Sequence, residues 1–168
     1  PGQPVLWWSP DPRCVLFPGA FHASRRLRRE MRRSDAEIRF NTCFDAVVAA
    51  CAEPRPGQDG TWIVPEMMTA YSRLHAEGWA HSIEVWQEDT LIGGLYGVVI
   101  GRVIFAESMF SRQSNASKYA LYALSQVLKV REFELIDCQQ TTDHLLSLGA
   151  REIPRKEFFK LLEAGGVG

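Results

Sequence analysis

The sequence lacks the spacings that would indicate a metal site or a disulfide framework. Its four cysteines include no CxxC pair, and its four histidines form no ligand pair at helical spacing. We therefore expect reduced, mostly buried thiols and no metal ion. The cysteines are Cys14, Cys43, Cys51 and Cys138, and the histidines are His22, His75, His81 and His144.

Long apolar runs and targeting signals are also missing. No stretch approaches the roughly 20 apolar residues that a membrane-spanning helix requires, and no signal-peptide pattern is present. We expect a cytoplasmic protein with no membrane partner.

The common nucleotide-binding and hydrolase motifs are absent too. There is no P-loop and no dinucleotide glycine fingerprint. Ser108, in AESMF, lacks the glycines of a nucleophile elbow. A Ser-His-Asp grouping could be drawn from Ser111, His81 and Asp137, but their spacing does not support it.

The sequence does contain the composition of an ordinary globular domain and one concentrated basic patch. At 168 residues, with 46% hydrophobic and 23% charged residues, the chain fits one domain with a sizeable core. The formal net charge of −1 gives no reason to expect a polyanionic partner. The basic charge is local, however, because six arginines fall in one short window: Arg25, Arg26, Arg28, Arg29, Arg32 and Arg33.

The arginine window is predicted to be an amphipathic helix over residues 20–33. Leu27 and Met31 fall on its apolar face, and the arginines fill the opposite face. A plain solvated basic face is the alternative. Like charges four residues apart are destabilising, and Glu30 is the only acidic residue in this helix. We therefore predict an anionic partner for this face, namely the phosphate backbone of a nucleic acid.

Hydrophobic periodicity predicts helices in the first half and a sheet in the second. Prolines 10 and 12 argue against a regular central strand, so residues 1–18 are predicted to be an extended arm of a single domain, residues 1–168. The other predicted elements are, in chain order: a helix over 39–51 after a short strand-like IRFN, a loop at 53–60 and a helix over 65–77. They continue with strands over 81–87, 91–99 and 102–110, a helix over about 115–130, a strand over 134–138, and helices over 143–149 and 156–164.

This order predicts an α+β fold with a mixed, mostly antiparallel sheet flanked by helices. The unit from 102 to 138 should be a right-handed parallel crossover. Gly93, Gly94 and Gly97 lie inside an apolar strand and indicate a bulge or a close backbone approach.

Two strands each carry an acid near their C-terminal ends. Glu107 interrupts the apolar run of residues 102–110, and Asp137 lies two residues before Gln139 in the apolar LIDCQ. Strand ends are common positions for functional side chains. We predict that these residues share a pocket that performs acyl transfer.

The β-β-α-β part resembles the Gcn5-related acetyltransferase superfamily, which implies an acetyltransferase-like fold. Those enzymes hold the coenzyme A pyrophosphate on a glycine-rich loop at a helix N-terminus. The corresponding loop here, residues 111–117, contains no glycine, so backbone amides cannot easily cradle a pyrophosphate. We expect the acyl group to arrive on another carrier.

Several long motifs occur in one order along almost the whole chain: LWWSPDPR, GTW, AHSIEVW, GGLYG, ESMFSR with NASK, LIDCQ and SLGA followed by EIPR. Together they closely resemble the leucyl/phenylalanyl-tRNA–protein transferase family. The resemblance implies transfer of Leu or Phe, with some Met, from charged tRNA to proteins that start with Arg or Lys, which tags them for N-end-rule degradation. It also implies a small domain ahead of LWWSP, so that residues 1–18 are its remnant.

The resemblance implies a role for each matching residue. Asp137 and Gln139 are implied to be catalytic and Glu107 to bind the acceptor, while the arginines of residues 25–33 are implied to bind tRNA. An apolar pocket for the donor side chain is implied at Leu95, Ile104, Met109, Leu121, Leu124, Leu128 and Ile136, although leucines at helical spacing are more often plain core.

The chemistry suits these residues. An aminoacyl ester is already activated, so we expect no cofactor. Gln139 cannot titrate, but its carbonyl can accept a hydrogen bond from the acceptor amine, and Asp137 can hold that amide from behind. For Glu107 the alternative is a simple ion pair with Arg112. We expect a monomer. The rival functions are a coenzyme A-dependent N-acetyltransferase and a non-catalytic tRNA-binding domain.

Overall fold

The computed structural model describes residues 9–54 and 61–168. The predicted loop at 55–60 and the first part of the predicted arm, with Trp7 and Trp8, lie outside these residues. The elements are, in order: β1 (Arg13–Leu16), α1 (Arg25–Arg33), β2 (Glu37–Phe40), α2 (Phe44–Ala52), α3 (Pro65–Ala76), β3 (Ala80–Gln87), β4 (Thr90–Ile100), β5 (Val103–Ser111), α4 (Ala116–Val130), β6 (Leu135–Gln139), α5 (Asp143–Ser147), β7 (Arg151–Ile153) and α6 (Arg155–Ala164).

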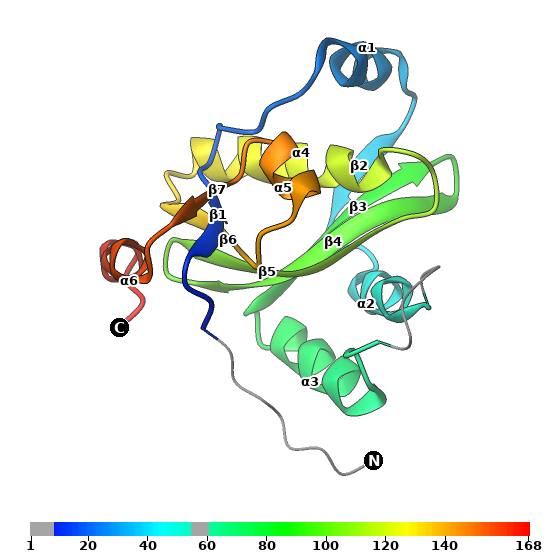
Figure 1. Ribbon diagram of the computed structural model, residues 1–168. Helices are drawn as coiled ribbons and strands as arrows, with labels where there is room; N and C mark the ends of the chain where they lie inside the picture. Colours follow the sequence, from blue (N-terminus) through cyan, green and yellow to red (C-terminus); the bar gives the residue numbers. More distant parts are fainter. Residues whose placement is uncertain (1–8, 55–60) are drawn as a thin grey trace.

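The strands form one 7-stranded sheet in the order β2-β3-β4-β5-β6-β1-β7. Helices α2 and α3 cover one face, α4 covers the other, and α6 lies beside the β7 edge (Figure 1). Helix α1 stands apart above the α4 layer. Within the described residues, no helix is both long and apolar enough to cross a bilayer.

The predicted α+β class with a mostly antiparallel sheet is confirmed. Every neighbouring pair of strands is antiparallel except β5 and β6. Those two strands are parallel and are joined through α4, as the crossover prediction requires. The β4-β5-α4-β6 unit is the part whose sequence pattern resembles the acetyltransferases.

The prediction that prolines 10 and 12 exclude a central strand is wrong for residues 13–16. These residues form β1, which pairs with β6 on one side and with β7 on the other. Proline limits only its own N–H and the residue before it, and β1 begins directly after Pro12. The run from Arg13 to Leu16 is completely buried.

Two predicted helices begin later than the periodicity indicated. Ser24 caps α1 by accepting a hydrogen bond from the Leu27 amide, so residues 20–24 lie outside the helix. Helix α2 begins at Phe44 instead of Arg39, because Glu37–Phe40 pairs with β3 as an edge strand. Pairing with a neighbouring strand overrode the local helical pattern here.

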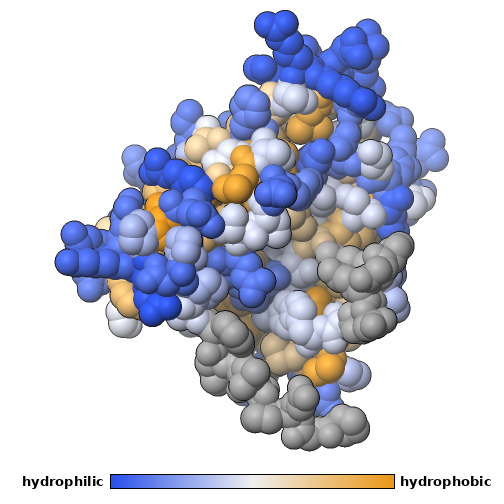
Figure 2. Space-filling model, in the orientation of Figure 1, coloured by the Kyte–Doolittle hydropathy of each residue, from blue (hydrophilic) through white to orange (hydrophobic). Residues whose placement is uncertain are grey.

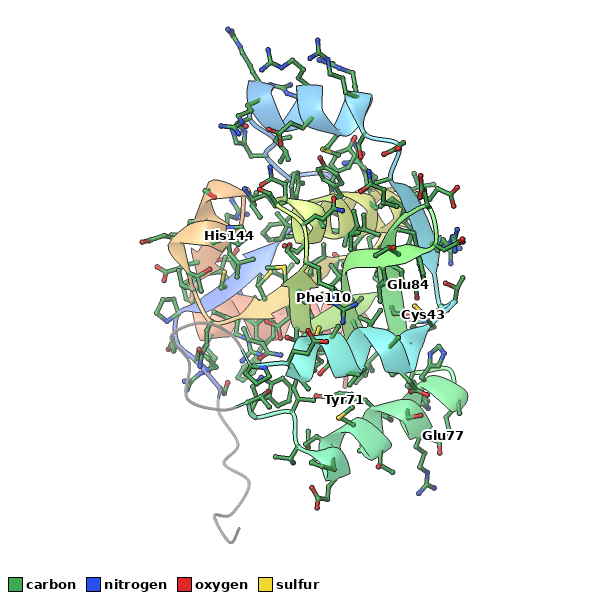
Figure 3. The ribbon with its side chains drawn as sticks, turned by 90° about the vertical axis from the view of Figure 1, so that its right-hand side faces the viewer. Cys43, Tyr71, Glu77, Glu84, Phe110 and His144 are labelled. Carbon is green, nitrogen blue, oxygen red and sulfur yellow. The ribbon has the colours of Figure 1, made fainter. Side chains whose placement is uncertain are left out.

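The start of α2 is fixed by a buried carboxylate on β3. Glu84 is fully buried, and it accepts hydrogen bonds from the backbone amides of Thr42 and Cys43 and from the hydroxyls of Thr42 and Ser82. Figure 3 shows Glu84 and Cys43 next to each other where β3 meets the start of α2. A carboxylate at this place satisfies helix donors that would otherwise lack partners.

The predicted bulge lies opposite Gly97. Tyr96 pairs with Ser108 but Gly97 pairs with Ala106, so Glu107 is the extra residue on β5. A Cβ atom on Gly97 would lie 2.5 Å from the Phe105 carbonyl oxygen, which only glycine avoids. The bulge changes the face on which the following residues lie: Met109 packs on the α4 side and Phe110 on the α2 side.

Candidate active site

The candidate site lies where the two parallel strands separate. The last pair between β5 and β6 is Phe105 with Asp137, and beyond it β6 no longer pairs with β5. Glu107 and Gln139 each follow that last pair by two residues on their own strand. The carboxyl ends of parallel strands are the usual place for a ligand crevice. The structure therefore brings together the three residues that the sequence analysis singled out.

Asp137 is held from the side opposite the site by Arg13. The Arg13 Nε lies 2.8 Å from Asp137 Oδ1, and the Arg13 Nη2 lies 2.6 Å from Oδ2. The same Oδ1 accepts the backbone N–H of Gln139 at 2.9 Å. Asp137 is fully buried, so both of its oxygens are satisfied inside the protein.

Gln139 is held by its backbone as well as by its side chain. Its φ is +64°, a left-handed conformation that is uncommon for a residue other than glycine. The Gln139 Nε2 donates to the Ala106 carbonyl at 3.3 Å. The contact with Asp137 therefore differs from the expected one, because Asp137 binds the main chain of Gln139 and not its side-chain amide.

Glu107 is the extra residue of the β5 bulge, half-buried between α3 and the end of β6. The Tyr71 hydroxyl, on α3, donates to Glu107 Oε2 at 3.0 Å. Burial raises the pKa of Glu107, and hydrogen bonds from Tyr71 and Gln139 partly offset that rise. The alternative ion pair with Arg112 is not formed; Arg112 Nη2 instead lies 2.6 Å from Glu53 Oε1.

The predicted donor-pocket residues form one cluster on the α4 face of the sheet. Six of them are buried members of this cluster: Leu95, Ile104, Leu121, Leu124, Leu128 and Ile136. Met109 is partly buried and packs against it. The structure thus places all seven together in one closely packed core.

The arginine face of α1 is exposed, and Leu27 is the only buried residue of that helix. Arg25, Arg26, Arg28, Arg29 and Arg32 line a surface hollow. Figure 2 shows hydrophilic side chains gathered over α1 at the top of the molecule. Glu30 accepts a hydrogen bond from Arg26 Nε at 2.8 Å and another from the side-chain Nδ2 of Asn115 at 2.6 Å. The second bond links α1 to the start of α4.

The loop before α4 has its own internal partners. The Ser111 hydroxyl accepts the Ser117 amide at 2.8 Å, and the Gln113 carbonyl accepts the Ala116 amide at 3.2 Å. Asn115 takes the left-handed conformation at this turn, with φ +68°. Two backbone donors that a glycine-rich loop would offer to a pyrophosphate are therefore already bonded.

Two residues at the site were missed by the sequence analysis. Tyr71 lies within the predicted helix over 65–77 with no sign of a functional role, and it is buried, but its hydroxyl reaches Glu107. Arg13 was quoted only as part of a motif. A charged residue that opens the apolar run RCVLF is a signal for a buried ion pair. Within residues 9–54 and 61–168, no three His, Cys, Asp or Glu side chains gather in a way that could hold a metal ion.

The arrangement is that of an α+β acyltransferase: a split between two parallel strands, a positioned carboxamide and two carboxylates, with no cradle for a pyrophosphate. The comparisons with known proteins then define the family. Residues 15–163 match the family model described as leucyl/phenylalanyl-tRNA protein transferase. The chain belongs to this family, and the prediction of an aminoacyltransferase is confirmed at that level.

Several similar curated proteins are named leucyl/phenylalanyl-tRNA–protein transferase. The chain is 58% identical to the one from Aromatoleum aromaticum over 93% of its own length and 66% of that protein. It is 57% identical to one from Pseudomonas fluorescens (94% and 70%) and 52% identical to one from Cellvibrio japonicus (96% and 69%). The chain therefore spans about two thirds of the length of these relatives.

Among solved structures, the likeness is more distant. AAC(6')-Iy, in complex with the bisubstrate analogue CoA-S-monomethyl-acetylneamine, aligns with 80% of this chain and 92% of its own at 15% identity, with a TM-score of 0.43. A conserved protein of unknown function from Staphylococcus epidermidis aligns with a TM-score of 0.44 at 13% identity, over 73% of this chain and 52% of its own. The fold class of this chain follows from its own strand order.

Proposed function

We propose that this chain transfers leucine or phenylalanine, and methionine less well, from charged tRNA to the N-terminal Arg or Lys of acceptor proteins. The observation that carries the proposal is the convergence of Glu107 and Gln139 at the split between β5 and β6, with Asp137 behind Gln139. The family to which the chain belongs supports the same reaction. Tagging of the acceptor for N-end-rule degradation, in the cytoplasm, is the expected consequence.

Glu107 is proposed to bind the first side chain of the acceptor. A guanidinium or ammonium group next to a half-buried carboxylate forms a charge-assisted contact. Tyr71 supports this role because its hydroxyl donates to one oxygen of the Glu107 carboxylate and so favours the ionised form.

Gln139 is proposed to bind the acceptor's α-amine. An α-amino group titrates near 7.7–8.0, so roughly a tenth to a fifth is neutral at pH 7, and a strong base is unnecessary. The Gln139 side-chain carbonyl can accept a hydrogen bond from this amine while its Nε2 is bound to Ala106. Positioning then supplies most of the rate.

The donor amino acid is proposed to insert beside Met109 into the cluster on the α4 face. This requires that the side chains over Leu95 and Ile104 separate, because both are now closely packed. Methionine side chains adapt well to such changes. Apolar pockets discriminate a methylene by only about 1–3 kcal/mol, which accounts for the expected transfer of some Met.

The arginine face of α1 is proposed to bind the tRNA backbone. Its arginines are exposed, and one of them, Arg26, is paired with Glu30 while the others are directed to solvent. The protein is proposed to act as a monomer.

The first test is transfer of labelled leucine from charged tRNA to a peptide that starts with Arg. We expect transfer by the chain extended at its N-terminus to the length of its relatives, and a loss of at least about a hundredfold in Asp137→Ala. Asp143→Ala, on the exposed first turn of α5, is the matched control and should retain the parent rate.

Three results would contradict the proposal. If neither this chain nor the extended form transfers leucine, the enzymatic function is wrong. If acetyl-coenzyme A raises the melting temperature, the coenzyme A-dependent alternative is favoured. If tRNA binds but substitution of Asp137 and Gln139 changes nothing, the chain is a tRNA-binding domain.

A further inference from the structure

The pair of Arg13 and Asp137 is a buried, two-point contact directly behind the candidate site. The two side chains are 10% and 0% exposed, and both hydrogen bonds are 2.8 Å or shorter. A planar guanidinium that binds both oxygens of a carboxylate fixes its orientation as well as its charge. Asp137 therefore cannot turn toward a substrate without leaving Arg13.

Arg13 is itself fixed by three neighbouring elements. Its strand, β1, pairs with β6 and β7, with Arg13 opposite Ile153. The ring of Phe158, on α6, lies 4.7 Å from the Arg13 guanidinium carbon. The first residue of α6, Arg155, donates its amide to Asp11. A guanidinium stacked on an aromatic face is held in one plane.

The last link runs from Asp137 to Gln139. The Gln139 backbone N–H donates to Asp137 Oδ1, and Gln139 takes the left-handed conformation that other residues than glycine rarely adopt. Such a conformation persists only where its surroundings hold it. The hydrogen bond to a fixed Asp137 holds this conformation together with the pairing of Gln139 with Cys14 on β1, and the Gln139 side chain reaches the Ala106 carbonyl.

We propose that Arg13 is a positioning residue for the transfer reaction, and that Phe158 on the C-terminal helix acts through it. The chain of contacts from Phe158 to Arg13, Asp137 and Gln139 sets the place of the amide that receives the acceptor amine. Neither Arg13 nor Phe158 touches a substrate. This inference rests on the proposed function for its kinetic consequences, but its structural consequence can be measured separately.

The kinetic test compares Arg13→Lys with the parent in the N-terminally extended form. Lysine keeps the charge but loses the planar fork, so we expect kcat to fall by about tenfold to a hundredfold. The KM for the acceptor peptide and the Kd for tRNA should stay within about twofold of the parent. Arg102→Lys is the matched control, because Arg102 forms a surface pair with Glu134 at 2.7 Å, and it should leave all three constants unchanged.

A second pair of variants tests the link through α6. Phe158→Leu keeps an apolar side chain but removes the ring beneath Arg13, so kcat should fall by roughly three- to tenfold at unchanged KM. Phe159→Leu, on the next residue and 49% exposed, should match the parent. If the melting temperature shows that Arg13→Lys does not fold, the comparison of Phe158→Leu with Phe159→Leu still tests the positioning role.

Hydrogen exchange of the Gln139 amide supplies the readout that does not depend on activity. In Arg13→Lys and Phe158→Leu this amide should exchange at least about tenfold faster, while amides of β3 stay protected. If the parent does not transfer leucine, the proposed function fails, and the exchange result still decides the positioning role. Unchanged kcat in both variants, or an unchanged exchange rate at Gln139, would overturn the inference.

Discussion

At the scale of single residues, Glu107 is the group whose ionisation should decide acceptor binding under the proposed function. Burial raises its pKa, and the Tyr71 hydroxyl lowers it again by donating to the carboxylate. A protonated Glu107 cannot pair with the positive first residue of an acceptor. Acceptor binding should therefore strengthen as the pH rises through the pKa of Glu107.

Tyr71→Phe removes the hydroxyl that stabilises the ionised form. The acidic limb of kcat/KM for the acceptor peptide should then move to higher pH, because the ionised Glu107 carboxylate loses a hydrogen-bond donor while its burial remains. The measurement is a pH profile of leucine transfer. Tyr122→Phe is the matched control, since Tyr122 packs on Phe21 away from Glu107. If the acidic limbs of Tyr71→Phe and Tyr122→Phe coincide, the role of Tyr71 is contradicted.

The ionisation of Glu107 also affects the free energy of unfolding, but in the opposite direction: a rise in pH should strengthen acceptor binding and lower stability. Because the folded pKa of Glu107 is raised, the folded state binds this proton more tightly than the unfolded chain. Its stabilising contribution is complete below the unfolded pKa and is lost as the pH rises through the folded pKa. In Glu107→Gln, the free energy of unfolding should lose this part of its pH dependence.

At the scale of elements, α1 is an exposed, arginine-rich helix with few contacts to the rest of the domain. Leu27 is its only buried residue, and the Glu30–Asn115 hydrogen bond links it to the start of α4. Its arginines repel one another at helical spacing, which costs helix stability unless an anion is bound.

Replacement of Arg28, Arg29 and Arg32 by Gln should weaken tRNA binding and flatten its salt dependence. Each lost phosphate contact lowers the slope of log K against log salt by about 0.9, so a decrease of about 2–3 is expected for the triple variant. Filter binding of charged tRNA at several salt concentrations measures it. A control with Arg73, Arg131 and Lys160 changed to Gln has the same net charge and should keep the parent slope. An equal loss of slope in both would place the tRNA contact elsewhere.

At the scale of the whole molecule, Glu84 joins the sheet to the α2–α3 layer that carries Tyr71. Glu84→Ala leaves the buried Ser82 hydroxyl and the part-buried Thr42 and Cys43 amides without their acceptor inside the protein, and an unsatisfied buried donor costs about 1–3 kcal/mol. The free energy of unfolding should fall by about 3 kcal/mol or more, as measured by urea denaturation. Glu37→Ala, at an exposed position on the adjacent strand, should change it by about 0.5 kcal/mol or less. Equal values for the two variants would contradict the role of Glu84.

The whole-molecule comparison also explains what sequence patterns can and cannot predict. The strands, the parallel crossover and the placement of Glu107 and Gln139 follow from local periodicity and chain order. Arg13 could not be placed this way, because its partner Asp137 is 124 residues away. The short strands β1 and β7 are likewise defined by the neighbours they pair with, and the burial of Glu84 depends on the turn at Thr42, 42 residues earlier.

The bulge at Glu107 determines on which side of the sheet each of the following side chains lies relative to Glu107. Beyond this extra residue on β5, Met109 lies on the α4 face and Phe110 on the α2 face, while Glu107 lies beside Tyr71. Glu107 and Met109 therefore lie on opposite sides of the sheet although they are two residues apart, because β5 has one residue more than β4 between the pairs Tyr96–Ser108 and Gly97–Ala106. Deletion of Glu107 would leave both pairs in place, so Met109 and Phe110 would keep their sides and only the carboxylate beside Tyr71 would be lost.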